Sequence, residues 1–380
     1  MLISAENLSF GFAGAPLLEN ISFTLSEGDR VGLIGPNGEG KTTLIRLILS
    51  ELEPESGALF KKNGCRIGYL AQTGGYDSEN TAFEEMRSVF REDIRAIDAL
   101  RETEAKIARA EEGSAEYRAL SARYDALTKQ IAARDSYHYE IKIRTVLNGM
   151  GFSDSFSQPV STMSGGEKTR LKLCRLLLEE PELLILDEPT NHLDIKTLFW
   201  LEDYLASFKG AILTVSHDRY FLDRLVREIY ELEGGTLSVF KGNYTKYKLL
   251  KAEKNARILK EYEKQQEEIA HLQDYVDRNL VRATTAKSAL SRVKKLEKME
   301  RIERPPLPPS PPRFSFSYAE KPYEKVLEVS DLRLAAGEKV LLENASFALT
   351  RGEKCAVVGD NGTGKSTLVK DCLLYTSPSP

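Results

Sequence analysis

The sequence predicts an α/β fold in which short apolar strands alternate with helices. Three observations lead to this prediction. Residues 31–34 form an apolar strand candidate before a Gly-rich loop and a helical pattern, residues 183–186 are apolar and end in two carboxylates, and residues 211–215 are apolar and lead to His217. Short apolar runs bounded by loops are typical of buried strands, and the loops at their carboxyl ends are where binding groups gather.

The composition narrows the class of protein. A length of 380 residues favours two or three domains, and 41% hydrophobic with 29% charged residues argues against disorder throughout. The 53 Lys and Arg against 57 Asp and Glu give a net charge of −4, so any polyanion contact must come from a local patch. The four cysteines form no CxxC pair, which argues against a zinc site or a disulfide framework. Residues 1–12 lack signal-peptide features and no apolar run approaches the ~18–20 residues of a membrane helix, so we expect a cytoplasmic, soluble chain.

The chain contains an internal repeat. Residues 17–46 align without gaps on residues 341–370, an offset of 324, and fifteen of the thirty positions are identical. This spacing is far beyond a solenoid period and predicts a duplicated domain. The second copy has about ten residues after its shared motif, so we expect residues 326–380 to be the first part of a second domain that is truncated here.

The region between the copies predicts two helical hairpins and a spacer. Residues 88–134 are charged, Ala-rich and periodic, with a break near residues 111–114, which predicts a helical arm inserted into a first domain at 1–240. Residues 241–304 have the same character and predict a hairpin linker whose tip lies at about 278–288. The Pro-rich stretch that follows predicts an extended spacer over 305–325.

A phosphate-binding loop motif occurs in both copies. Residues 35–42 and 359–366 match GxxxxGK[ST], the first between a strand candidate and a helical pattern, as this motif requires. Glycines let backbone N–H groups close around phosphate oxygens, the Lys reaches the terminal phosphates and the hydroxyl binds Mg²⁺. The predicted ATP-binding residues are Gly35, Asn37, Gly38, Gly40, Lys41, Thr42 and Thr43, and in the second copy Asn361, Gly362, Gly364, Lys365, Ser366 and Thr367.

Further candidate residues follow the other strands and one helix start. Asp187 ends an apolar strand, where a phosphate-loop enzyme needs a carboxylate for its metal, and Glu188 could polarise an attacking water. His217 follows the next strand, where γ-phosphate sensors lie. Residues 164–167, SGGE, offer bare N–H donors at a helix start, although such a sequence is more often only a helix cap.

These motifs together resemble an ATP-binding cassette. The order is GPNGEGKTT, IGYLAQ, MSGGEKTR, LLILDEPTNHLD and LTVSHDRYFLD. The tandem arrangement, the charged helical linker and the run GNYTKY at residues 242–247 resemble the ABC-F family, whose members are soluble tandem ATPases that act on ribosomes as translation factors or as antibiotic-resistance ribosomal protection proteins. The resemblance implies a P-loop NTPase of ATP-binding-cassette type, with an inserted helical arm and a helical-hairpin linker.

The resemblance also implies roles for single residues. Phe12 would stack on adenine, Asp187 and Gln72 would bind Mg²⁺ with Thr42, and Glu188 would be the general base with Gln72 and His217 as catalytic partners. The signature Ser164, Gly165, Gly166 and Glu167 would clamp a nucleotide held by the opposite cassette, and Asp194 would contact that cassette. The chain departs from the common pattern at Met163 and Glu167, and Ala336 falls where the first copy has Phe12.

The linker is the basic part of the chain. Residues 241–304 contain seventeen Lys and Arg against ten Asp and Glu, a net of +7, and residues 278–298 contain seven bases and one acid. A charged helical face is often only solvated, but this asymmetry favours contact with phosphates. The candidate RNA contacts are Arg278, Arg282, Lys287, Arg292, Lys294 and Lys295. The family resemblance implies that the partner is the ribosome, with its rRNA and tRNA.

Two other functions fit parts of the sequence. One is the ATPase subunit of a membrane transporter, and the other is a related tandem ATPase that acts on branched DNA. In the family each ATP lies between the loop of one cassette and the signature of the other, and the second copy here has only its loop. We therefore expect the chain to bind ATP at the first cassette and to turn it over poorly, unless two first cassettes pair.

Overall fold

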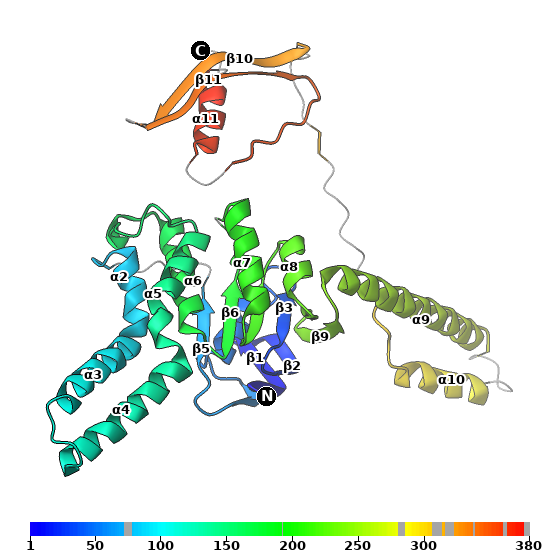
Figure 1. Ribbon diagram of the computed structural model, residues 1–380. Helices are drawn as coiled ribbons and strands as arrows, with labels where there is room; N and C mark the ends of the chain where they lie inside the picture. Colours follow the sequence, from blue (N-terminus) through cyan, green and yellow to red (C-terminus); the bar gives the residue numbers. More distant parts are fainter. Residues whose placement is uncertain are drawn as a thin grey trace. The chain divides into compact units, whose positions relative to one another are not determined.

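The computed structural model describes residues 1–71, 78–191, 193–279, 286–305, 314–315, 323–336, 339–359 and 363–375 (Figure 1). The chain divides into two units, one of residues Phe240–Tyr323 and one of Met1–Val239 with Glu324–Pro380.

The first cassette is built on a mainly parallel six-stranded sheet in the order β5-β6-β7-β3-β8-β9. The strands are β3 (Arg30–Ile34), β5 (Ile67–Leu70), β6 (Leu183–Asp187), β7 (Ala211–Val215), β8 (Glu228–Glu233) and β9 (Thr236–Lys241). The four pairings from β5 to β8 are parallel, and every residue of β6 and β7 is buried. Parallel strands are covered on both faces, which explains why their sequences are uninterrupted apolar runs.

A smaller antiparallel sheet lies beside this one in the order β2-β1-β4, with β1 (Ile3–Phe12), β2 (Ala15–Leu25) and β4 (Ser56–Lys61). Helix α1 (Lys41–Ile48) packs among residues of both sheets, since Leu44, Ile45, Leu47 and Ile48 share one buried cluster with residues of β1, β2, β3 and β8. Burial of this apolar face holds the start of α1 at the end of β3.

Helices form the rest of the cassette. They are α2 (Ala82–Arg87), α5 (Tyr139–Gly149), α6 (Gly165–Glu179), α7 (Ile195–Ser207) and α8 (Arg219–Leu225), with short 3₁₀ turns η1 (Ser88–Phe90), η2 (Ser136–His138) and η3 (Val160–Thr162). Between α2 and α5 the chain forms an arm of α3 (Arg91–Ile107) and α4 (Ala115–Arg134), which Figure 1 shows as a hairpin. Ile97 and Leu100 of α3 pack against Ile131 of α4.

The sequence repeat is also a repeat of backbone structure. Strands β10 (Lys325–Ala336) and β11 (Lys339–Thr350) pair in the register of β1 and β2, because Leu327↔Leu349 and Ala336↔Lys339 repeat Ile3↔Leu25 and Phe12↔Ala15 at the offset of 324. Each first strand has one left-handed residue, Asn7 or Asp331, whose N–H donates to a serine hydroxyl at 2.9 Å. Helix α11 (Lys365–Tyr375) takes the place of α1 in this copy.

The second unit contains α9 (Tyr244–Asn279) and α10 (Ala286–Lys298), which pack together as a hairpin (Figure 1). Leu272, Val276, Ala289 and Leu296 are buried between them. Four polar contacts join α9 to α10 and to the residues that follow α10. Gln265 bonds the backbone of Glu300 and Ile302, Glu268 pairs with Lys295 at 2.6 Å, and the Arg292 guanidinium lies 3.3 Å from the centre of the Tyr275 ring.

Candidate functional site

A pocket of about 710 Å³ lies at the carboxyl ends of β3, β6 and β7. The parallel pairing of these strands directs their carboxyl ends to one edge of the sheet, as in other α/β proteins that bind ligands there. The pocket brings together these predicted residues: Phe12, Asn37, Gly38, Gly40, Lys41, Thr42, Thr43, Asp187, Glu188 and His217.

The loop after β3 has the backbone geometry of a phosphate cradle. Gly38 and Gly40 have left-handed φ angles of 90° and 96°, and α1 begins directly after them. The Lys41 ammonium lies across the loop and donates to the carbonyl oxygens of Gly35 at 2.7 Å and Pro36 at 2.8 Å. A Cβ on Gly35 would come within 2.2 Å of the Leu232 carbonyl oxygen, so only glycine fits between the loop and β8.

The charges in this pocket act on one another. Burial lowers the pKa of the Lys41 ammonium, and the nearby carboxylates of Asp187 and Glu188 partly offset this effect. Burial also raises the pKa of Asp187, the Glu188 carboxylate raises it further, and Lys41 opposes both. A cation or a bound metal ion at this point would favour the charged form of Asp187.

Glu188 carries the strongest sign of a reactive position. Its φ is +52°, a left-handed conformation that non-glycine residues rarely adopt, and its N–H donates to the carbonyl of Val215 at 2.8 Å. Its Oε2 accepts from the His217 N–H at 3.4 Å, and its Oε1 lies 3.6 Å from Nε2 of His217. Among the described residues, this buried Oε1 has no hydrogen-bond partner. An unsatisfied carboxylate oxygen is suited to accept a proton from water.

The residues present fit a Mg²⁺ that arrives with its nucleotide. Mg²⁺ is usually held by one or two carboxylates together with substrate phosphates and waters. Thr42 and Asp187 line the same pocket as the phosphate loop, whereas the described part of the chain contains no cluster of three or more His, Cys, Asp or Glu that would hold a metal alone. Gln72 lies outside the described residues.

Phe12 offers an aromatic surface at the rim of the pocket. It ends β1, its side chain is 52% exposed, and Phe10 meets it edge to face at a centroid distance of 5.0 Å. An exposed ring held by a neighbour is suited to stacking on a flat base. In the second copy the corresponding backbone position is Ala336, whose side chain has no ring.

The signature residues cap a helix in this chain. Ser164 precedes α6 and accepts from the Glu167 N–H at 3.4 Å, while Glu167 Oε2 accepts from the Ser164 N–H at 2.8 Å, which is a capping box. Residues 164–167 are not among the described residues that line the pocket. Asp194 similarly caps α7 through the Thr197 N–H at 2.8 Å. Their roles against an opposite cassette stay predictions.

The second loop repeats one contact of the first. Lys365 Nζ donates to the Gly359 carbonyl at 2.7 Å, which matches Lys41 and Gly35, and Gly364 has a φ of 95°. Ser366 and Thr367 lie in α11, while Asn361 and Gly362 fall outside the described residues.

The candidate RNA contacts divide into two groups. Arg292 and Lys295 make contacts across the linker hairpin, with Tyr275 and Glu268. Lys287 and Lys294 are exposed, Arg278 is exposed and pairs with Asp274 at 2.8 Å on its own helix, and Arg282 lies outside the described residues. The hairpin contacts make Arg292 and Lys295 weaker candidates for binding RNA than Lys287 and Lys294.

Three pocket residues were missed in the sequence analysis: Leu17, Asn191 and Val215. Asn191 was within reach of sequence reasoning, because it lies three residues after Glu188, and its N–H donates to the Glu188 carbonyl at 3.2 Å. Leu17 is the first residue of the repeat, but its apolar side chain carries no signal for binding.

The chain is similar to known proteins over nearly its whole length. A family profile described as ABC transporter matches residues 18–191 and 342–379, and another with that description matches 230–316. The chain is 45% identical to the putative ATP-binding protein YdiF of Bacillus subtilis (strain 168), with 100% of the chain aligned to 59% of that protein. It is 34% identical to ABC transporter F family member 5 of Arabidopsis thaliana, covering 97% of the chain and 54% of that protein. It is 32% identical to the energy-dependent translational throttle protein EttA of Escherichia coli O6:H1, covering 93% and 62%.

This chain belongs to the ABC-F family. The family that the motifs predicted is therefore confirmed. The predicted fold class, an α/β P-loop ATPase fold of ATP-binding-cassette type, is also confirmed. The chain spans between 54% and 62% of the length of these three ABC-F and ATP-binding relatives. No helix in the described part of this ABC-F chain is both long and apolar enough to cross a membrane.

Replacement of Lys41 tests the phosphate loop. We expect Lys41→Ala to lower the affinity for Mg-ATP by at least about tenfold, because a charge-assisted contact contributes about 1.5–3 kcal/mol. The fold should persist, since the ammonium bonds only loop carbonyls within the described part of the chain. Isothermal titration calorimetry measures the affinity and circular dichroism the fold. Wild-type affinity in a folded Lys41→Ala protein would show that the loop does not bind phosphates.

The raised pKa of Asp187 predicts a pH effect on metal binding. Protons compete with Mg²⁺ for this carboxylate. In the presence of ATP, the affinity for Mg²⁺ should therefore be highest at high pH, where Asp187 is ionised, and should fall as pH decreases through the raised pKa. The loss should begin at a higher pH than for a carboxyl with the ordinary pKa of 3.8.

Asp187→Asn is the control for this pH effect, because ATP itself also titrates and does so equally with both proteins. The difference in Mg²⁺ affinity between wild type and Asp187→Asn, measured from neutral pH down towards 3.8, the ordinary pKa of this carboxyl, should shrink as pH falls. A constant difference over that range would contradict a role for the Asp187 carboxylate in holding Mg²⁺.

Proposed function

We propose that the first cassette binds and hydrolyses Mg-ATP in this pocket, as part of an ABC-F protein that acts on the ribosome. The observation that supports hydrolysis is the gathering of Lys41, Asp187, Glu188 and His217 at one edge of the sheet, where one Glu188 oxygen has no hydrogen-bond partner among the described residues. The same constellation would be difficult to explain as a purely structural feature, because buried charged groups that serve structure alone are normally paired.

Each residue has a part in this proposed reaction. Lys41 and the first amides of α1 would hold the β- and γ-phosphates, and Thr42 and Asp187 would hold Mg²⁺, which would supply positive charge beside the phosphates. Glu188 accepts a proton as a water molecule attacks the γ-phosphorus, the bond to the bridging β–γ oxygen breaks, and ADP and phosphate leave. His217, beside Glu188, orients the transferred group. Positioning and electrostatics, rather than covalent chemistry, supply most of the rate.

The signature is proposed to act on a second cassette. Residues 164–167 and Asp194 would face a nucleotide bound at another loop, so that ATP joins two cassettes and hydrolysis separates them. The arm of α3 and α4 and the linker of α9 and α10 would move with this closure. Pairing of two first cassettes would complete a site in this chain, so its turnover should rise steeply with protein concentration.

Two observations support the ribosome as the partner. The linker has a net charge of +7 with exposed lysines on α10, which suits the phosphate backbone of folded RNA. One relative is named an energy-dependent translational throttle protein, and the similarity to it covers 93% of this chain. A role in ordinary translation and a role in antibiotic protection both fit this architecture.

A variant that binds ATP without hydrolysing it tests this function. Glu188→Gln should remain with ribosomes during centrifugation when Mg-ATP is present, because the unhydrolysed nucleotide keeps the closed state. Lys41→Ala should remain in the supernatant under the same conditions. Binding should weaken steeply as salt increases. If Glu188→Gln binds ATP but does not pellet at low salt, the ribosomal part of the proposal is wrong and the ATPase part stands.

The two groups of basic linker residues predict different outcomes. Lys287→Gln with Lys294→Gln removes two exposed charges. The slope of the logarithm of ribosome affinity against the logarithm of salt concentration should become shallower by about two, one for each phosphate that is no longer neutralised. Arg292→Gln with Lys295→Gln removes the same charge but breaks contacts with Tyr275 and Glu268, so it should mainly lower the thermal stability of the hairpin. Equal loss of binding with unchanged hairpin stability for both pairs would show that only total charge matters.

A further inference from the structure

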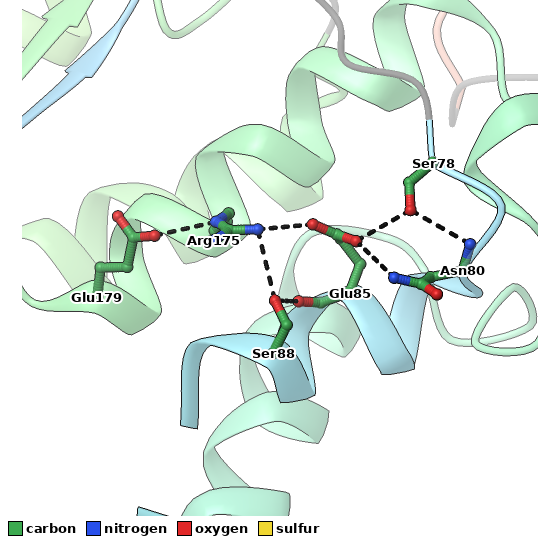
Figure 2. Close-up of polar contacts among 6 residues, drawn as sticks. All are labelled: Ser78, Asn80, Glu85, Ser88, Arg175 and Glu179. Atoms are coloured by element: carbon green, nitrogen blue, oxygen red, sulfur yellow. Dashed lines mark hydrogen bonds and ion pairs between the residues drawn. The ribbon is translucent and has the colours of Figure 1, made fainter. Parts of the chain in front are cut away.

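A buried carboxylate outside the nucleotide pocket joins three segments of the cassette. Glu85 of α2 is only 7% exposed. Its Oε1 accepts from Nη1 of Arg175 at 2.6 Å, and its Oε2 accepts from the Ser78 hydroxyl at 3.1 Å and from Nδ2 of Asn80 at 3.2 Å (Figure 2). Burial of a carboxylate is costly unless charge and hydrogen bonds compensate it, so these partners are needed together.

Arg175 brings the signature helix into this cluster. It lies on α6, the helix that residues 164–167 begin, and its Nε also bonds Glu179 Oε1 at 2.9 Å, one turn further along α6 (Figure 2). Ser88 closes the cluster, because its hydroxyl donates to the Glu85 carbonyl at 2.6 Å and lies 3.5 Å from Nη1 of Arg175. The planar guanidinium therefore fixes α6 to α2 in one orientation.

The segment that Glu85 holds also reaches the signature through its backbone. Residues 78–83 run antiparallel to residues 156–161. The N–H groups of Ser161 and Val160 donate to the carbonyls of Ser78 and Asn80, both at 3.0 Å. Residue 161 is three positions before Ser164. Side-chain contacts thus connect residues 78–83 to helix α6, and backbone contacts connect them to residues 156–161, which precede the signature.

The same helix borders the carboxylates of the nucleotide pocket. A cavity of about 10 Å³ is lined on one side by Thr169, Arg170 and Leu173 of α6 and on another by Asp187 and Glu188. Such a volume holds about one water molecule at most. The middle of helix α6 therefore borders the proposed catalytic residues, and Arg175, nearer its end, contacts Glu85.

We propose that Glu85 and Arg175 are positioning residues that make α2, α6 and residues 78–83 move as one body. A change at Asp187 and Glu188 on nucleotide binding is then passed through α6 to residues 164–167, which form the contact with a second cassette. This inference rests on the proposed function, because it requires nucleotide to bind at Lys41. Neither residue lines the nucleotide pocket, so both act through the position of the signature.

Hydrogen exchange of the full chain, with and without the magnesium complex of the non-hydrolysable ATP analogue AMP-PNP, tests this coupling. In the wild type the nucleotide should slow exchange in peptides covering 37–43 and also in peptides covering 156–167. In Glu85→Gln we expect slowing at 37–43 to remain, while the effect at 156–167 falls by about tenfold, the scale of effects caused by misplacing a supporting group. Ser78→Ala with Asn80→Ala, which keeps the ion pair with Arg175, should give the same direction of change with less risk to folding.

Glu84→Gln is the matched control. Glu84 directly precedes Glu85 on α2, but its carboxylate accepts from the backbone N–H and the hydroxyl of Thr81 in a capping box. This variant should keep the nucleotide effect at 156–167.

Three results would overturn the inference. The first is an unchanged nucleotide effect at 156–167 in both Glu85→Gln and the variant with Ser78→Ala and Asn80→Ala. The second is a loss of the nucleotide effect in Glu84→Gln equal to that in Glu85→Gln. The third is exchange in Glu85→Gln that is faster by the same factor with and without nucleotide, which indicates an effect on stability alone. Absence of slowing at 37–43 in the wild type would instead refute the proposed function itself.

Discussion

The parallel pairing of β3 with β7, and of β7 with β6, is the constraint on which the nucleotide pocket depends. Residues 30–32 pair with 212–214, and residues 183–187 pair with 211–215, so three strand ends that are far apart in sequence meet at one edge. The burial of β6 and β7 in the sheet core specifies this register. A different register would move Asp187 away from the loop that carries Lys41. The pocket is therefore a consequence of how the sheet core packs.

Polar groups at this edge are incompletely satisfied. Asp187 is buried beside a second carboxylate, Glu188 has a left-handed backbone, and one Glu188 oxygen has no hydrogen-bond partner among the described residues. Such features reduce stability and persist only where the surrounding structure holds them, as the packed sheet does here. By contrast, Glu85 is also buried but uses both of its carboxylate oxygens. This difference separates a site suited to chemistry from a cluster suited to holding helices together.

The linker shows why charge alone does not identify a binding surface. All six candidate RNA contacts are basic and lie in the charge-rich part of the linker at or near the expected tip of the hairpin. The pairing of α9 with α10 turns Arg292 towards Tyr275 and brings Lys295 into an ion pair with Glu268. Lys287, Lys294 and Lys295 are all exposed, but Lys295 is held by this contact. A cation that lies over an aromatic ring or beside a carboxylate already has a partner within its own fold, which a phosphate would have to replace or share.

The sequence by itself determined the fold class and most of the pocket in the first cassette. Lys41, Asp187 and His217 each follow a strand whose apolar pattern is local, so spacing alone was sufficient to find them. Only the tertiary structure decided that Val215 and Leu17 line the pocket, that Arg175 pairs with Glu85 across 90 residues, and that two linker cations face the neighbouring helix. The physical reason is that these contacts depend on strand register and helix packing. Those are set by burial summed over the whole core and leave no pattern in any short segment.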